Sequence, residues 1–124
     1  MSRIIIVDDD PQFYAFMAAF LRAQGHHVNL ATDPTQLYVV IRDLRPDLVI
    51  LDTQMPEGGG PMAVRVLQEN LDYRVPLLIC SGMPVAHLKS WYPDGPDRRY
   101  LTKPVELDWV QRYVRELLAV PTGG

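Results

Sequence analysis

Four short apolar segments of this chain each run directly into a polar or charged residue, and this pattern does most to limit the folds open to it. The segments and the residues that follow them are Ile4–Val7 before Asp8-Asp9-Asp10, Leu48–Leu51 before Asp52, Leu77–Cys80 before Ser81, and Tyr100–Thr102 before Lys103. Longer amphipathic segments separate them, which is typical of a parallel β-sheet with helices on its faces. Because parallel strands end at the same edge of a sheet, we expect these polar residues to gather in one crevice.

The predicted fold is an α/β domain with an open, doubly wound, five-stranded parallel sheet in the order 2-1-3-4-5. The remaining strand of that sheet is His27–Ala31, whose alternating polarity suits an edge position. A chain of 124 residues has the size of a single domain. We therefore expect one domain over residues 1–121 and a short tail at 122–124.

Aspartate followed by proline opens two of the predicted helices, at Asp10-Pro11 and Asp33-Pro34, and this pair is a strong start signal. A third helix should begin at Pro61, prolines confine a fourth to about Val85–Trp91, and the last spans about Glu106–Val120. The apolar stripes of the first, second and last helices comprise Phe13, Met17, Phe20, Leu21 and Gln24; Leu37, Val40, Ile41 and Leu44; and Leu107, Val110, Tyr113, Val114, Leu117 and Leu118.

Composition excludes several classes of function. The formal net charge of −3 gives no basic face for nucleic acid. No apolar stretch approaches the ~20 residues of a membrane span, and the N-terminal apolar run, which ends in aspartates, does not resemble a signal peptide. Cys80 is the one cysteine, so the chain can form no internal disulfide. These features predict a cytoplasmic domain with neither a nucleic-acid nor a membrane partner.

The three carboxylates of Asp8, Asp9 and Asp52 predict a cation site. Two carboxylates 4 Å apart repel by about 4 kcal/mol at an effective dielectric of ~20, so a fold keeps such a cluster most readily when a cation neutralises it. Mg2+ prefers oxygen ligands of this kind, and a backbone carbonyl just past Asp52 could add another. Taken singly, such residues are common in turns, caps and solvated surfaces, and Asp10 serves as a helix cap in either case. Their coincidence at four strand ends favours a shared site.

At this point the residues carry a family resemblance. Val7-Asp8-Asp9, Asp52 with Met55-Pro56 and Gly60, Pro76 before Ser81, and Tyr100–Pro104 resemble the receiver domain of bacterial two-component response regulators, over essentially the whole chain. The resemblance implies a flavodoxin-like receiver fold. It also implies a phosphoacceptor signalling domain rather than an enzyme, which phosphorylates and dephosphorylates itself at Asp52 only.

The resemblance assigns roles by position. Asp52 would take a phosphoryl group from a histidine kinase or a histidine phosphotransfer protein, and Lys103 would pair with a phosphoryl oxygen. Mg2+ would be held by Asp8, Asp9, Asp52 and the main-chain carbonyl of Gln54. Ser81 and Tyr100 occupy the positions of the family's switch residues, and the protein would be a monomer or a weak homodimer.

Physical chemistry supports these roles independently. Phosphoryl transfer depends mainly on alignment and on neutralising charge, because the transition state carries negative charge on its equatorial oxygens. Mg2+ and the Lys103 ammonium would place positive charge beside those oxygens. Contacts from Ser81 to the new phosphoryl group would draw the following loop inward, and Tyr100 could then turn from exposed to buried.

Two other classes of function compete with this interpretation. The first is a phosphatase, because Asp8-x-Asp10, Ser81 and Lys103 also resemble the first motifs of haloacid-dehalogenase-like phosphatases. That family needs a further acidic pair on another strand after the lysine, and this chain offers none there. Asp52 would also have no role in such an enzyme. A receiver-like module that binds partners without phosphorylation is the second alternative, although it has no need for a complete acidic pocket. Flavin binding is disfavoured because an acidic crevice repels a flavin phosphate.

Overall fold

The structure is a computed structural model that describes residues 2–52, 65, 75–91 and 93–120. Three sequence predictions lie outside these residues. They are the helix expected from Pro61, the main-chain carbonyl of Gln54, and the tail at 122–124.

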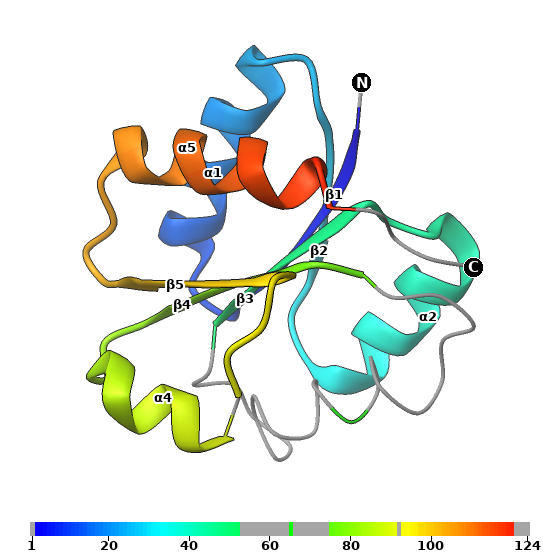
Figure 1. The fold of residues 1–124 in the computed structure, drawn as a ribbon. Coiled ribbons are helices and arrows are strands. Elements are labelled where there is room, and N and C mark those ends of the chain that lie inside the picture. Colours follow the sequence, from blue (N-terminus) through cyan, green and yellow to red (C-terminus); the bar gives the residue numbers. More distant parts are fainter. Residues whose placement is uncertain (1, 53–64, 66–74, 92, 121–124) are drawn as a thin grey trace.

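The described residues form a five-stranded parallel sheet in the order β2-β1-β3-β4-β5, as predicted (Figure 1). Its strands are β1 (Arg3–Val7), β2 (His27–Ala31), β3 (Leu48–Asp52), β4 (Leu77–Ser81) and β5 (Arg98–Thr102). The central strands β3 and β4 are buried along their whole length, whereas the edge strand β2 alternates between exposed and buried residues. Continuous apolar runs therefore mark strands with helices over both faces, and alternation marks the edge.

Four helices are described: α1 (Pro11–Ala23), α2 (Pro34–Leu44), α4 (Val85–Trp91) and α5 (Leu107–Leu118). Both predicted caps are confirmed. The Asp10 side chain accepts a hydrogen bond from the backbone N–H of Gln12 at 3.0 Å, and the Asp33 side chain accepts one from that of Gln36 at 2.9 Å. The predicted bounds of α4 are confirmed, and α5 is slightly shorter at both ends than predicted.

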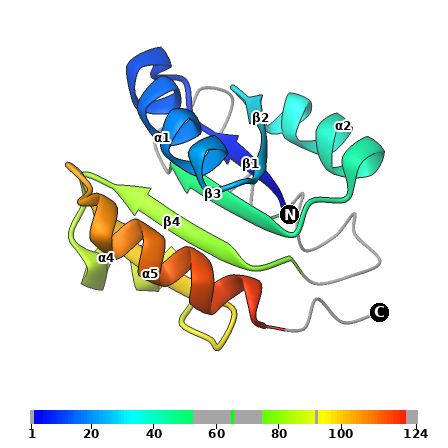
Figure 2. The same ribbon diagram turned by 90° about the horizontal axis from the view of Figure 1, so that it is seen from above.

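The helices form a layer on each face of the sheet, with α1 and α5 on one side and α2 and α4 on the other (Figures 1 and 2). Alternate residues of a strand point to opposite faces, and β1 shows this directly. Ile4 and Ile6 pack in the core cluster that contains α1 and α5 residues, while Ile5 and Val7 pack in the cluster with α2 and α4 residues. Burial on both faces holds β1 in place, and therefore the aspartates that follow it.

Two details differ from the sequence prediction. Strand β5 begins at Arg98 rather than Tyr100, because two arginines extend this half-buried edge strand beyond its apolar residues. Gln24, assigned to the buried stripe of α1, is exposed and forms the C-cap, where its backbone N–H bonds to carbonyls of the last helical turn. The chain then leaves the helix through Gly25, whose φ of 94° is a conformation that favours glycine.

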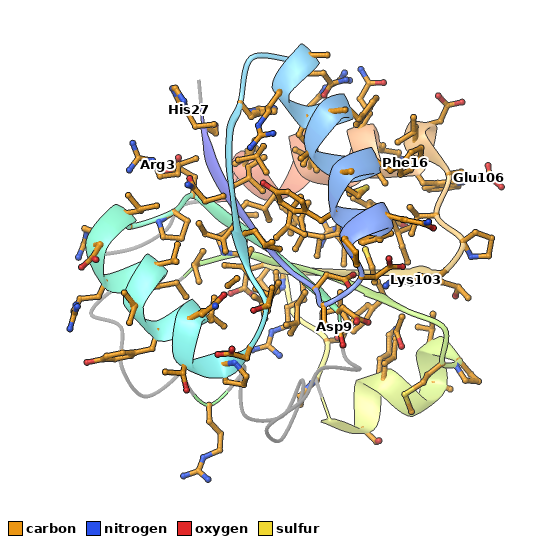
Figure 3. All side chains as sticks on the ribbon, turned by 180° about the vertical axis from the view of Figure 1, so that it is seen from behind. Arg3, Asp9, Phe16, His27, Lys103 and Glu106 are labelled. Carbon is orange, nitrogen blue, oxygen red and sulfur yellow. The ribbon has the colours of Figure 1, made fainter. Side chains whose placement is uncertain are left out.

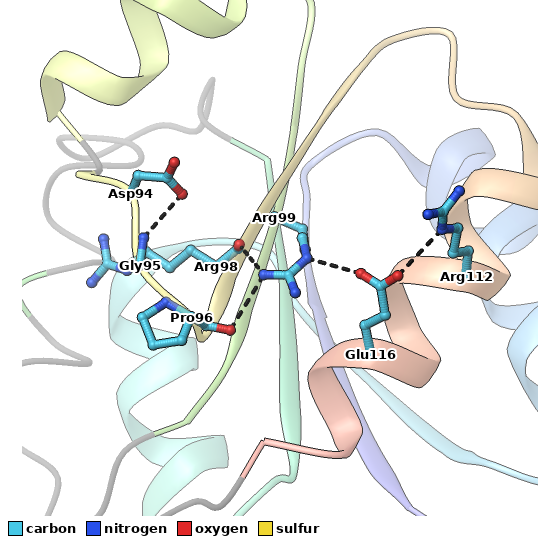
Figure 4. Close-up of polar contacts among 7 residues, drawn as sticks. All are labelled: Asp94, Gly95, Pro96, Arg98, Arg99, Arg112 and Glu116. Carbon is cyan, nitrogen blue, oxygen red and sulfur yellow. Dashed lines mark hydrogen bonds and ion pairs between the residues drawn. The ribbon is translucent and has the colours of Figure 1, made fainter.

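Arg99 joins β5 to α5 through a small polar network (Figure 4). Its Nε lies 3.0 Å from Glu116 Oε1, and Arg112 Nε lies 3.2 Å from the other carboxylate oxygen, Oε2. The Arg99 guanidinium also donates to the carbonyls of Pro96 and Arg98. Hydrogen bonds from Arg99 and then from Arg112 lower the pKa of the Glu116 carboxyl below its ordinary value. The network explains how an arginine is accommodated in this strand.

Candidate functional site

The sheet register brings the predicted site residues to one edge. Val7 pairs with Leu51, Asp52 pairs with Cys80, and Ser81 pairs with Thr102. The residues that follow or end these strands, which are Asp8, Asp9, Asp52, Ser81 and Lys103, therefore lie side by side at the carboxyl edge. Figure 3 shows Asp9 and Lys103 together at this end of the sheet, whereas Arg3 and His27 lie at the opposite end.

The three carboxylates converge as predicted. Asp8, Asp9 and Asp52 each offer one carboxylate oxygen, and these oxygens all lie within 4.8 Å of one another. Asp8 is 1% exposed and Asp52 is 5% exposed, whereas Asp9 is exposed at the rim. Buried carboxylates this close require compensating charge, and a hard divalent cation suits an all-oxygen ligand set with an open side. The donor set therefore fits Mg2+.

Lys103 supplies positive charge to the same cluster. Its Nζ donates a hydrogen bond to Asp8 Oδ2 at 2.9 Å and lies 3.5 Å from Asp52 Oδ1. Burial by itself would lower the pKa of this ammonium, but the hydrogen bond with Asp8 and the negative charge of Asp52 outweigh burial and raise it above the ordinary value. Lys103 therefore stays protonated at neutral pH.

Ser81 ends β4 inside the pocket and is completely buried. Its Oγ accepts a hydrogen bond from the backbone N–H of Met83 at 3.1 Å, and its carbonyl accepts one from the backbone N–H of Lys103 at 2.8 Å. The serine therefore shapes the turn that leads into α4 and also anchors the backbone of Lys103. A displacement of Ser81 would therefore alter its hydrogen bonds with both Met83 and Lys103.

Tyr100, the predicted aromatic switch residue, lies on β5 and is half-buried against the core cluster of the α2 and α4 face. The Nζ of Lys89 on α4 lies 5.5 Å from the centroid of its ring. Burial first, and then the negative charge of Asp94, raise the pKa of the Tyr100 hydroxyl. Tyr100 on β5 thus contacts α4 through Lys89.

Cys80 lies directly beside the site but acts as a buried apolar residue. The side chain is completely buried, and burial raises the pKa of its thiol to about 12. A neutral thiol is a poor nucleophile and a poor ligand for a hard cation. Cys80 is therefore a core residue beside the site and takes no part in its chemistry.

One neighbour of the site was not predicted from the sequence. Phe13, assigned only to the apolar stripe of α1, places its ring centroid 4.1 Å from Lys103 Nζ. The available signal was its position in the first turn of a helix that starts immediately after the aspartates. Apolar spacing explains why Phe13 faces the sheet, but spacing alone names no partner 90 positions away in the chain.

The fold and this edge define a class of protein, namely a doubly wound α/β domain with a cluster of three carboxylates and a lysine bonded to it. The chain matches the response regulator receiver domain family over residues 4–115, and it belongs to that family. It is therefore a receiver domain of the kind found in two-component response regulators, which histidine kinases phosphorylate. The prediction from sequence is confirmed at this level, and the haloacid-dehalogenase alternative is wrong.

Two curated relatives show how the chain compares in length. It is 32% identical over 120 residues to the protein PilH of Pseudomonas aeruginosa, and the match covers 96% of this chain and 99% of PilH. It is 38% identical over 89 residues to the DNA-binding response regulator MtrA of Mycolicibacterium smegmatis, covering 72% of this chain but only 35% of MtrA. The match to MtrA therefore concerns about a third of that protein.

Solved structures agree on the fold. The receiver domain of the sensor histidine kinase PA1611 from Pseudomonas aeruginosa, solved with a magnesium ion coordinated in its active site cleft, superposes with a TM-score of 0.82 at 26% identity, covering 96% of this chain and 98% of that one. A putative response regulator from Chloroflexus aurantiacus gives a TM-score of 0.83 at 26% identity, again covering 96% of this chain and 98% of that one.

Among the described residues, no helix is both long and apolar enough to cross a membrane.

Proposed function

We propose that Asp52 is the phosphoacceptor of this receiver domain and that Asp8, Asp9 and Asp52 hold Mg2+ beside it. The observation that carries the proposal is that Asp52 contributes to the carboxylate cluster and also lies next to the ammonium of Lys103. Its carboxylate is a member of the three-carboxylate cluster, and its Oδ1 also lies 3.5 Å from the Lys103 ammonium. A phosphoryl group attached there would lie between a divalent cation and an ammonium.

The surroundings of the three carboxylates favour Asp52 over its neighbours as the nucleophile. Asp8 has a partner on each oxygen, because Oδ1 accepts from the backbone N–H of Asp10 at 2.9 Å and Oδ2 accepts from Lys103. Asp9 is exposed at the rim, where water competes for the same contacts. Asp52 ends the central strand β3, between the strands that lead to Asp8 and Ser81.

In the transfer, an Asp52 oxygen forms a bond to phosphorus while the bond between phosphorus and a nitrogen of the donor phosphohistidine breaks. Bound Mg2+ supplies positive charge to the phosphoryl oxygens. The Lys103 ammonium, which lies 3.5 Å from Asp52 Oδ1, turns an N–H toward a phosphoryl oxygen, and the Ser81 hydroxyl donates to another. The donor nitrogen leaves on the kinase or phosphotransfer protein.

Several finer assignments rest on the family resemblance. They are the Gln54 carbonyl as a further metal ligand, self-phosphorylation and self-dephosphorylation at Asp52 only, and a monomer or weak homodimer. The single domain over residues 1–121 rests on chain length instead. The switch is the inward movement of the loop behind Ser81, which makes room for the ring of Tyr100. Its extent is limited by the difference in free energy that the phosphoryl contacts provide between the two states.

The test is intact-mass spectrometry after treatment with a small phosphodonor in the presence of Mg2+. We expect a gain of one HPO3 in the wild type and none in Asp52→Asn. Asp10→Asn is the matched control, since it removes an adjacent carboxylate but keeps an oxygen for the helix cap, and it should react like the wild type. No adduct in the wild type, or an equal adduct in Asp52→Asn, would contradict the proposal and favour a module that works without phosphorylation.

A further inference from the structure

The Lys103 ammonium has an aromatic neighbour as well as two anionic ones. Its Nζ lies 4.1 Å from the centroid of the Phe13 ring, 2.9 Å from Asp8 Oδ2 and 3.5 Å from Asp52 Oδ1. A lysine ammonium over an aromatic face at this distance is attracted by the negative face of the ring. Phe13 is therefore a third contact of the Lys103 ammonium.

The position of the Phe13 ring depends on the same loop that carries the carboxylates. Phe13 lies in the first turn of α1, and the Asp10 cap, with Pro11 at the first helical position, fixes where that helix starts. The ring is half-buried and packs against the core cluster that includes Met17 and Val110. Core packing therefore holds the ring where its face meets the Lys103 ammonium.

The ring and the carboxylates hold the ammonium in different ways. Asp8 accepts a directional hydrogen bond, whereas an aromatic face attracts charge without fixing the direction of any N–H. The backbone of Lys103 is fixed by its hydrogen bond to the Ser81 carbonyl, but a lysine stem is long and flexible. Phe13 therefore restrains the tip of the side chain while leaving its N–H groups able to turn.

We propose that Phe13 is a positioning residue for Lys103. When a cation and a phosphoryl group engage Asp8 and Asp52, both anionic partners of the ammonium change, and the ring of Phe13 is the contact that persists. It keeps the ammonium beside Asp52 while an N–H turns from carboxylate to phosphoryl oxygen. This inference rests on the proposed role of Asp52.

The test compares Phe13→Leu, Phe13→Tyr and a matched control, Phe20→Leu. Phe20 lies on the same helix and is also half-buried against the same core cluster, so its replacement measures the general cost of removing a phenylalanine from α1. The first readout is the initial rate of phosphorylation by a small phosphodonor at saturating Mg2+. The second is the proton NMR shift of the Lys103 ε-methylene group in the unphosphorylated protein, where a ring face causes an upfield shift.

Phe13→Leu should slow phosphorylation about fivefold, as expected for the loss of one cation–π contact, and should abolish the upfield shift. Phe13→Tyr keeps the aromatic face, so it should keep both the rate and the shift. Phe20→Leu should leave both readouts close to wild type. Magnesium affinity should be nearly equal in all four proteins, because no metal ligand is altered.

Three results would overturn the inference: a wild-type rate in Phe13→Leu, an equal slowing in Phe20→Leu, or no upfield shift in the wild type. A wild-type protein that takes up no phosphoryl group refutes the proposed role of Asp52 instead. In that case, the NMR comparison alone decides whether Phe13 holds the ammonium, because it is made without phosphorylation.

Discussion

Lys103 donates a hydrogen bond to Asp8 at 2.9 Å, across 95 positions of the chain, and lies farther, at 3.5 Å, from Asp52. Asp8 is therefore the principal counter-ion of the lysine. One ammonium cannot neutralise both buried carboxylates and the nearby Asp9. The remaining negative charge makes the binding of a further cation favourable.

Replacing Asp9 should change metal affinity and stability in opposite directions. Asp9→Asn deletes a metal ligand and also relieves repulsion at the rim, so we expect Mg2+ affinity to fall by about tenfold while the metal-free protein gains about 0.5 kcal/mol. Thermal melting with Mg2+ and with EDTA measures both, because a ligand of the native state raises Tm. Asp10→Asn is the control and should keep the full Mg2+-dependent rise. An undiminished rise in Asp9→Asn would remove Asp9 from the metal site.

Replacing Lys103 should lower the free energy of unfolding, because the buried carboxylates would lose their compensating charge. Lys103→Met leaves Asp8 and Asp52 buried without their ammonium, so the free energy of unfolding in EDTA should fall by roughly 2 kcal/mol. Mg2+ should still bind and should restore much of that loss. The phosphorylated variant should lack the wild-type change in the environment of Tyr100, which tyrosine NMR signals report.

The control for this prediction is Lys89→Met, which removes an exposed lysine from α4. It should change stability in EDTA by no more than about 1 kcal/mol, because its contacts with Tyr100 and Asp94 lie at the surface. Equal destabilisation by Lys103→Met and Lys89→Met would show that Lys103 does not compensate the buried carboxylates.

The part of the site that sequence could predict is the part encoded by local pattern. An apolar run followed by Asp8, Asp52 or Ser81 identifies the strand and its end, and the doubly wound order then places those ends on one edge. The contact between Lys103 and Phe13 had no such signal. Phe13 fits the apolar spacing of α1 completely, and only the packed structure shows that its ring lies beside an ammonium.

The start of β5 shows the same limit for the fold. Two arginines do not look like strand residues, so sequence placed the start at Tyr100 rather than at Arg98. Arg99 can occupy the strand because Glu116 on α5 neutralises it at 3.0 Å, and that pairing depends on how α5 lies against the edge. Tertiary contacts of this kind commonly override the local preference of a residue for one secondary structure.

The ion pairs of Glu116 should make the free energy of unfolding depend on pH, and this dependence can be assigned to the Glu116 carboxyl. The pKa of Glu116 is lowered in the folded protein, so its contribution is present above the ordinary glutamate value of 4.5 and is lost as pH falls through the lower folded value. Glu116→Gln should therefore be slightly less stable than wild type at pH 7. The difference should vanish in strongly acidic solution, and urea unfolding across this range measures it.

Arg99 provides the control for this pH dependence. In an Arg99→Met background, Glu116 keeps its contact with Arg112 but loses the larger one, so Glu116→Gln should have a smaller effect at pH 7. A difference between Glu116→Gln and wild type that stayed constant with pH would mean that packing, rather than charge, carries the contribution of Glu116.

The contact of Lys89 with Tyr100 should bias the proposed switch. The Lys89 ammonium lies 5.5 Å from the ring centroid and 3.3 Å from Asp94 Oδ2, so its contact favours the half-buried ring position that the structure shows over the inward one. Lys89→Met removes this contact from the half-buried state alone. Because an exposed cation–π contact contributes about 0.5–1 kcal/mol, the inward population of the unphosphorylated protein should rise about two- to fivefold.

The ring signals of Tyr100 in NMR spectra measure this population, with the phosphorylated wild type as the reference for the inward state. Asp94→Asn is the matched variant, since it removes the ion pair of Lys89 but leaves the ammonium free to contact the ring. It should therefore shift the signals less than Lys89→Met. If both variants left Tyr100 unchanged, the contact with Lys89 would not influence the position of the ring.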